Sequence, residues 1–261
     1  LEGAGHRPPL PDDPPSFRTP GDLQAQADAS GRIPIATAVL GPSAGHGALS
    51  APLADFTVMT EQASIFTAGP PLVKASLGED ITKEELGGPG IALHSGVIHN
   101  LARNDESALE QIRTWLSYLP SSAWQAPTRL ADAEGERTVN ELLNIIPENP
   151  RQAYDMHDVI NAVTDSGSVF AIQPMFGQSL ITCFARLSGR PVAIVANQPQ
   201  HMAGSITVEA ADKATQFIQV ADSFHLPLIF LTDNPGVLAG SSSEKAGILR
   251  HAGRMFLAQH H

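Results

Sequence analysis

The run GPSAGHGALSAPLADF, from Gly41 to Phe56, is the segment of this chain best suited to catalysis. It directly follows the apolar segment 33–40. A glycine-rich turn that ends a β-branched run and opens a helix of small residues points several backbone N–H groups at one position. Such donors stabilise a developing oxyanion or a phosphate. From the residues alone, a tight strand-to-helix turn without a catalytic task explains the run equally well.

Two further segments combine turn residues with polar groups. Asp233-Asn234-Pro235-Gly236 follows the apolar segment 226–231, and its composition is typical of a turn. Gly87-Gly88 follows TKEEL, where a short helix capped by glycine is as good an explanation as contact with a ligand.

Composition limits the partners that this chain can have. Of its 261 residues 42% are hydrophobic and 16% charged, which is typical of a globular protein. Sixteen Lys and Arg against 27 Asp and Glu give a net charge of −11, which argues against sequence-independent binding of nucleic acid. No apolar run approaches the roughly 20 residues needed to cross a bilayer, so no membrane association is expected. Residues 1–20 are polar and proline-rich, unlike a signal peptide, and a cytoplasmic enzyme is the default interpretation.

Cysteine and histidine usage predicts no metal site. Cys183 is the single cysteine and lies in the apolar stretch 180–187, so we expect a buried, inert thiol rather than a nucleophile. The ten histidines show no metal-ligand spacing on a convincing helix, and no bound metal is predicted.

Hydrophobic patterning predicts an α/β protein, because strands alternate with helices. Residues 1–21 hold six prolines and are expected to form an irregular loop. Strands are predicted over 33–40, 56–59, 64–66, 169–172, 180–187, 191–197 and 226–231, and helices over 157–163, 209–224, 242–258 and from the cap Asn104 to Pro120. Three parts follow: a first half over 1–120, an interdomain segment over 121–155 with one short helix, and a second half over 156–261.

Long segments in collinear order resemble one family. SGRIPIATAVLGPSAGHGALSAPLADF and HSGVIHNLARNDESALEQIRTWLSYLP are similar to the first half of the carboxyltransferase (beta) subunit of biotin-dependent acyl-CoA carboxylases. IIPENPRQAYDMHDVINAVTDSG, FARLSGRPVAIVANQP and PLIFLTDNPGVLAG are similar to its second half. The resemblance covers nearly the whole chain, whereas any single motif is weak.

The resemblance implies a tandem of two related crotonase-like domains, each a ββα superhelix. It also implies an oligomer in which acyl-CoA binds the first half and carboxybiotin the second. The carboxyl group then passes from biotin to the α-carbon of acetyl-, propionyl- or methylcrotonyl-CoA, which reacts as an enolate. No biotin-attachment motif and no ATP-binding glycine loop occur here, so a biotin carboxylase and a biotin carrier are the expected partners.

Carried over residue by residue, the resemblance assigns a backbone oxyanion hole to Gly45 and His46. Many family members have a second glycine where His46 stands, but histidine keeps the N–H. Gly41, Ala44 and Gly47 belong to the same turn. The resemblance also places Gly69, Gly87 and Gly88 on the acyl-CoA side, and Asp233, Asn234, Pro235 and Gly236 on the carboxybiotin side.

The same resemblance suggests that both halves are incomplete. LPLIFLTDNPGVL resembles LEGAGHRP in setting an acidic residue and turn formers after a strand end, as expected of duplicated halves. A second glycine turn then lies past His261 and an opening unit before Leu1. We therefore expect an internal fragment that is inactive by itself.

Three other functions remain open. The carboxyltransferase part of a sodium-pumping decarboxylase runs the same transfer in reverse. A crotonase-type hydratase needs two glutamates at the acyl group, but the carboxylates nearest the turn are Asp55 and Glu61. A non-catalytic, truncated assembly subunit is the alternative from a different class.

Overall fold

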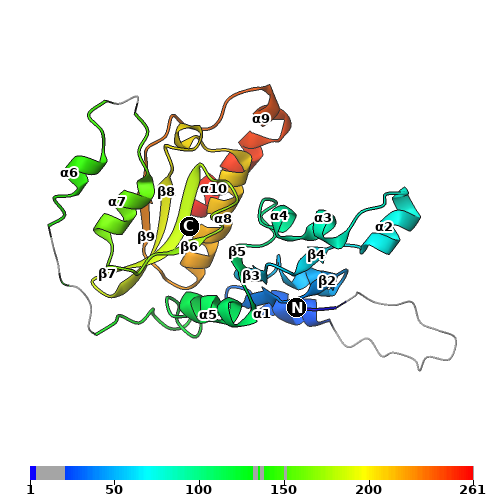
Figure 1. The fold of residues 1–261 in the computed structure, drawn as a ribbon. Coiled ribbons are helices and arrows are strands. Elements are labelled where there is room, and N and C mark those ends of the chain that lie inside the picture. The colour runs from blue at the N-terminus through cyan, green and yellow to red at the C-terminus, as the bar shows by residue number, and fades with distance from the viewer. Residues whose placement is uncertain (4–20, 132–134, 136–137, 150–151, 261) are drawn as a thin grey trace. The chain divides into compact units, whose positions relative to one another are not determined.

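The computed structural model describes residues 1–3, 21–131, 135, 138–149 and 152–260 (Figure 1). Most of the proline-rich loop expected over 1–21 lies outside the described residues. The chain separates into two compact units, Leu1–Arg113 and Thr114–His261. In this division the interdomain segment groups with the second unit, and the domain boundaries expected at 120 and 155 stay a prediction.

The first unit is built on parallel strands. β1 (Ala36–Val39), β3 (Phe56–Thr60) and β5 (Asn100–Ala102) form one sheet in the order β1-β3-β5, with Ala36 opposite Phe56. β2 (Pro42–Ala44) pairs with β4 (Ser64–Phe66), also in parallel. β3 is buried along its whole length, which is why it is apolar apart from two threonines. The predicted strands at 33–40, 56–59 and 64–66 are confirmed.

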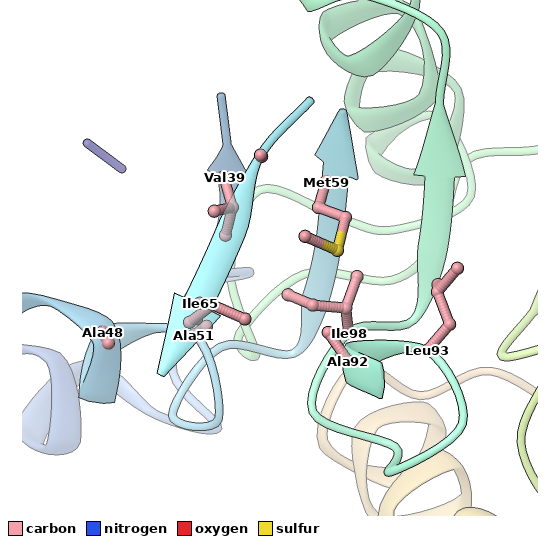
Figure 2. Close-up of a cluster of buried hydrophobic side chains, with 9 residues drawn as sticks. Val39, Ala48, Ala51, Met59, Ile65, Ala92, Leu93 and Ile98 are labelled. Carbon is pink, nitrogen blue, oxygen red and sulfur yellow. The ribbon is translucent and has the colours of Figure 1, made fainter. Parts of the chain in front are cut away.

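A core of small and medium apolar side chains lies beneath the glycine-rich turn. Figure 2 shows Val39 of β1, Met59 of β3 and Ile65 of β4 around it. The turn continues into η1, a 3₁₀ helix over Gly47–Ser50, and Ala48 of that helix belongs to the same core. Burial of these side chains therefore fixes the turn from both of its ends.

Two helices of the first unit begin where a polar side chain accepts a backbone N–H group. α3 (Lys83–Gly87) starts with a capping box between Thr82 and Glu85. Asn104 caps α5 (Asp105–Leu116), because its Oδ1 accepts from the Ser107 amide at 3.0 Å, which confirms the predicted cap. The remaining helices are α1 (Asp22–Ala29), α2 (Pro70–Leu77) and α4 (Pro89–Ala92). The sequence patterns did not predict α1.

The second unit has one mixed sheet. Its strands are β6 (Phe170–Ile172), β7 (Leu180–Leu187), β8 (Arg190–Asn197) and β9 (Leu228–Leu231), in that spatial order. β6, β7 and β8 pair antiparallel, and β8 pairs with β9 in parallel. The four predicted strands are confirmed.

Helices cover both faces of this sheet. α7 (Met156–Val163) packs over Ile181, Cys183 and Ile194, with α6 (Leu142–Ile145) beside it. α8 (Val208–Ser223) packs on the opposite face, where its Phe217 meets Phe184 with ring centroids 4.9 Å apart. The expected single short helix between residues 121 and 155 is α6.

The prediction of one continuous C-terminal helix over 242–258 is wrong. The structure has α9 (Ser241–Lys245) and α10 (Ile248–His260), separated by Gly247 with φ +83°. A residue in this left-handed conformation cannot continue a right-handed helix, and glycine adopts it without a Cβ clash. α10 packs on α8.

Cys183 is fully buried, and burial raises the pKa of its thiol to about 12. The thiolate is therefore absent near neutral pH. The interpretation of Cys183 as a buried, inert thiol is confirmed.

Candidate functional site

The glycine-rich turn lies past the carboxyl end of β1, at the edge of a parallel sheet where α/β proteins bind ligands. Gly45 has φ +65°, a conformation that favours glycine. His46 has φ −56° and ψ −45°, the right-handed helical region that any L-residue adopts. A histidine in place of a second glycine therefore fits this backbone without strain.

The backbone amides of the turn differ in whether they are engaged. The Gly45 N–H donates to the Phe66 carbonyl at 3.2 Å, as part of the pairing between β2 and β4. The N–H groups of His46 and Gly47 have no acceptor among the described residues. The prediction of an oxyanion hole at Gly45 and His46 stays a prediction, and the two adjacent amides that lack an acceptor here are those of His46 and Gly47.

The side chain of His46 points to α1. Its Nε2 lies 2.8 Å from Oδ1 of Asp22, and both side chains are mostly exposed. The hydrogen bond from His46 lowers the pKa of Asp22. Solvent screens such a pair, so it contributes little to stability. The backbone of His46 is thus the part of this residue that the turn holds in place.

Of the other glycines of the first unit that were predicted to line a site, Gly87 and Gly88 lie against backbone atoms. A Cβ on Gly87 would lie 2.0 Å from the Ile65 carbonyl oxygen, and one on Gly88 would lie 2.6 Å from that of Glu84. Gly69 caps α2, and a Cβ on Gly41 would meet the Glu2 side chain at 2.8 Å. Ala44 is buried in β2. Contact of these residues with a ligand stays a prediction.

Asp55, just before β3, has a carboxyl group that is partly removed from water. Burial raises its pKa from 3.8 to about 6, although its Oδ2 accepts from the Ile35 amide at 2.8 Å. Because the folded state prefers the protonated form, the protein loses stability as pH rises from about 4 to about 6, and the cost persists above that range.

We therefore expect Asp55→Asn to raise the free energy of unfolding at pH 7–8 by about 2–3 kcal/mol. The amide oxygen still accepts from Ile35, and the ionisable group is gone. Urea unfolding at pH values from 3.5 to 8 measures this, with the exposed Asp28→Asn as the control. The gain should vanish below pH 4; a gain that is independent of pH would refute the assignment to ionisation.

In the second unit, Asn197 organises the turn predicted on the carboxybiotin side. Asn197 ends β8 and the turn follows β9, so both lie at the carboxyl ends of adjacent parallel strands. Its Oδ1 accepts from the Asn234 amide group at 2.8 Å and from the Asp233 backbone at 3.3 Å. Its Nδ2 donates to the Gly204 carbonyl at 2.9 Å. Within the turn, Gly236 N–H donates to Asn234 Oδ1 at 2.7 Å.

We expect Asn197→Ala to lower the free energy of unfolding by about 2–3 kcal/mol, because three hydrogen bonds to a 4% exposed side chain are lost at once. Denaturant melts compare it with Asn144→Ala on exposed α6. Equal, small losses in the two variants would show that the Asn197 network does not hold the turn.

Asp233 of this turn lines a cavity of about 360 Å³. Its Oδ2 accepts from the Tyr154 hydroxyl at 2.9 Å, and burial together with this bond raises the pKa of Tyr154 to about 12. Pro199 and Ala203 contribute to the same cavity. Pro235 and Gly236 do not line it.

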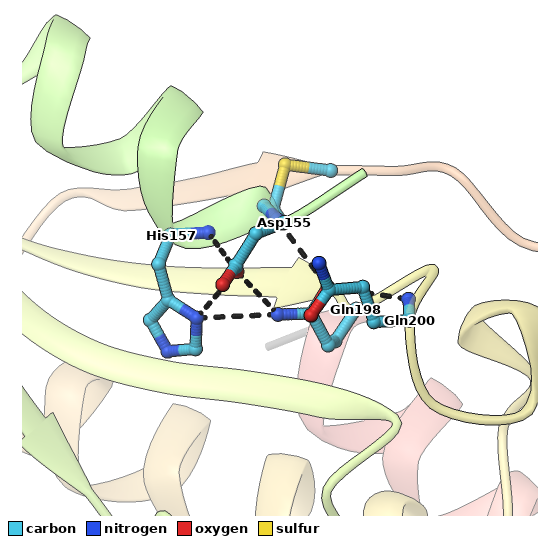
Figure 3. A network of polar contacts seen from close by, with 5 residues as sticks. Asp155, His157, Gln198 and Gln200 are labelled. Carbon is cyan, nitrogen blue, oxygen red and sulfur yellow. Dashed lines mark hydrogen bonds and ion pairs between the residues drawn. The ribbon is translucent and has the colours of Figure 1, made fainter. Parts of the chain in front are cut away.

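A polar network beside this cavity was not predicted from the sequence (Figure 3). Asp155 Oδ1 lies 2.8 Å from His157 Nδ1 and accepts from Gln198 Nε2 at 2.7 Å. Burial acts to raise the pKa of Asp155, but the bonds from Gln198 and His157 outweigh it and leave that pKa below its ordinary value. The signal available in the sequence was Asp155 two residues before His157 at a helix start; Gln198 lies far along the chain.

Within the described residues, no cluster of three or more His, Cys, Asp or Glu side chains is arranged to hold a metal ion. No helix of the described part is long and apolar enough to cross a bilayer.

Comparison with known proteins points to one family. The model of the carboxyl transferase domain matches residues 18–259. The propionyl-CoA carboxylase carboxyltransferase subunit of Haloferax mediterranei is 42% identical over 239 residues, which is 90% of this chain and 46% of that protein. The methylmalonyl-CoA decarboxylase subunit alpha of Veillonella parvula is 39% identical, over 88% of this chain and 46% of that protein.

A solved structure of transcarboxylase 12S, with methylmalonyl-coenzyme A and methylmalonic acid bound, aligns with a TM-score of 0.87 at 37% identity. The alignment covers 90% of this chain and 46% of the 12S chain. The predicted crotonase-like α/β fold is thereby confirmed, and this chain spans about half the length of the relatives it matches.

Proposed function

We propose that this chain, which belongs to the carboxyl transferase domain family, takes part in moving a carboxyl group between biotin and the α-carbon of an acyl-CoA. The relatives named above act as a carboxylase, a decarboxylase and a transcarboxylase, so the proposal covers both directions of transfer. The observation that carries it is the pair of adjacent amides, at His46 and Gly47, that lack acceptors among the described residues just past the end of β2.

These amides suit the charge that carboxyl transfer creates. When the α-carbon of an acyl-CoA becomes nucleophilic, negative charge develops on the thioester oxygen as an enolate. Donors that the fold already holds in place stabilise this charge without reorganising, and one such donor contributes about 2.7–4 kcal/mol. The His46 N–H is common to the predicted pair and to the pair without acceptors, so we assign it the central role and Gly47 the second donor.

The second unit supplies the carboxybiotin side in this proposal. The turn Asp233–Gly236 and its cavity would receive the biotin of a partner carrier, which a biotin carboxylase charges. Asp233 is held by Tyr154 and Asn197 rather than free to move, which suits a positioning role. Short acyl chains (acetyl, propionyl or methylcrotonyl) and assembly as a homo-oligomer are further parts of the proposal.

The first test measures the binding of acyl-CoA rather than turnover, because the chain spans only 46% of the length of its propionyl-CoA carboxylase relative. Calorimetric titration compares acetyl-CoA, propionyl-CoA and methylcrotonyl-CoA with a coenzyme A nitronate that mimics the enolate. We expect the nitronate to bind at least about 100-fold more tightly than the matching thioester. A carboxylated biotin carrier is then added and the labelled acyl product is measured. Equal affinity for thioester and nitronate would contradict the proposal.

A further inference from the structure

A second, smaller cavity of the second unit is lined mainly by β6, β7 and the start of α7, and its volume is about 170 Å³. Ala171 and Thr182 contribute from the strands, His157 and Lys213 from α7 and α8, and Gln198 and His201 from the loop after β8. Sites for drug-sized ligands start at about 300 Å³, so this one suits a molecule of only a few atoms.

Lys213 is a buried lysine with no carboxylate partner among the described residues. It is 2% exposed, and its Nζ donates to the carbonyls of Phe176 at 2.6 Å and Gln173 at 3.2 Å. An ammonium has three N–H groups, and the third has no acceptor in the described part of the chain. Burial lowers the pKa of Lys213 to about 7. A charge removed from water in this way is costly unless an opposite charge pairs with it.

The rest of the cavity wall favours a negative ligand. The titratable side chains that line it are bases, His157 and His201 besides Lys213, and no Asp or Glu is among the described lining residues. Asp155 is not among the lining residues, and its Oδ1 is engaged by His157 Nδ1 and Gln198 Nε2. Figure 3 shows this arrangement, in which the outer nitrogen of the His157 ring points away from Asp155.

We propose that this cavity binds a small carboxylate-type anion, bicarbonate or formate in size, with Lys213 as its charged anchor. The anion supplies the acceptor for the third N–H of Lys213 and the counter-charge that the protein lacks there. The volume excludes nucleotides and other drug-sized anions. This binding requires neither biotin nor acyl-CoA, so its test is independent of the proposed carboxyl transfer.

The test is a titration of ¹³C-formate with the 261-residue chain, followed by the ¹³C line width at constant ionic strength in sodium chloride. Unlabelled bicarbonate is the competitor, and adenosine monophosphate is the anion too large for the cavity. We expect saturable broadening that bicarbonate reverses and adenosine monophosphate does not. Lys213→Met and the cavity-filling Ala171→Leu should each weaken formate binding at least about tenfold. The exposed Lys245→Met makes the same charge change elsewhere and should leave binding unchanged.

If Lys213→Met fails to fold, Ala171→Leu still tests the proposal, because it fills the cavity and leaves the hydrogen bonds of Lys213 in place. Circular dichroism and thermal melts establish the folded state of each variant. Formate binding that survives Ala171→Leu, or that adenosine monophosphate reverses as well as bicarbonate does, overturns the proposal. So does the absence of saturable broadening with the unmodified chain, or broadening that chloride alone abolishes.

Discussion

His46→Pro is expected to lower carboxyl transfer about 10²–10³-fold in a full-length version of the subunit, and to lower by the same factor the preference of this chain for the enolate-like nitronate over the thioester. Proline removes the backbone N–H assigned to the oxyanion and changes little else. The φ of −56° at His46 is close to the angle that proline imposes, and the His46 N–H has no acceptor among the described residues. The preceding residue, Gly45, has no Cβ that would clash with the proline ring.

Two controls separate the amide from the imidazole ring. His46→Ala keeps the N–H and loses only the exposed contact with Asp22, so most activity should remain. Gly47→Ala keeps the second amide, and a Cβ there meets nothing within 4 Å. Comparable activity of folded His46→Pro and His46→Ala would remove the oxyanion role from this residue. A large loss in His46→Ala would instead indicate catalysis by the imidazole.

Local chemistry explains why many elements were predictable. β-Branched and apolar runs predicted β3, β7 and β8, because a strand buried on both faces needs such residues along its whole length. Asn104 predicted the start of α5, because its side chain satisfies an amide that the helix leaves without a partner.

The details of the site depended on pairings that no local pattern contains. β2, over Pro42–Ala44, was interpreted as part of a turn, yet it pairs with β4, and this pairing engages the Gly45 amide. Gln198 meets Asp155 across 43 residues of chain. Lys213 follows Asp212 on a helix, where a lysine is ordinarily solvated, and only the packing of α8 on the sheet buries it. Tertiary contacts decide each of these cases.

Gly87 links the packing of the first unit to its turn. The residue ends α3 where that helix crosses β4, and the place of its missing Cβ is taken by the backbone of Ile65. β4 continues to Phe66, whose carbonyl accepts from the Gly45 amide. Ile65, on which α3 packs, directly precedes Phe66, which accepts the hydrogen bond that holds the glycine-rich turn.

We expect Gly87→Ala to lower the free energy of unfolding by about 3–5 kcal/mol, the range of a severe core substitution. A Cβ would lie 2.0 Å from the Ile65 carbonyl oxygen and 2.8 Å from its carbon, and backbone atoms of a buried strand cannot move aside as a flexible side chain does. Gly90→Ala in α4 is the matched control. Its Cβ meets nothing within 4 Å, and alanine favours the helix by about 0.5–1 kcal/mol. Urea unfolding of the two variants measures the difference, and a loss below 1 kcal/mol for Gly87→Ala would contradict the close approach of α3 to β4.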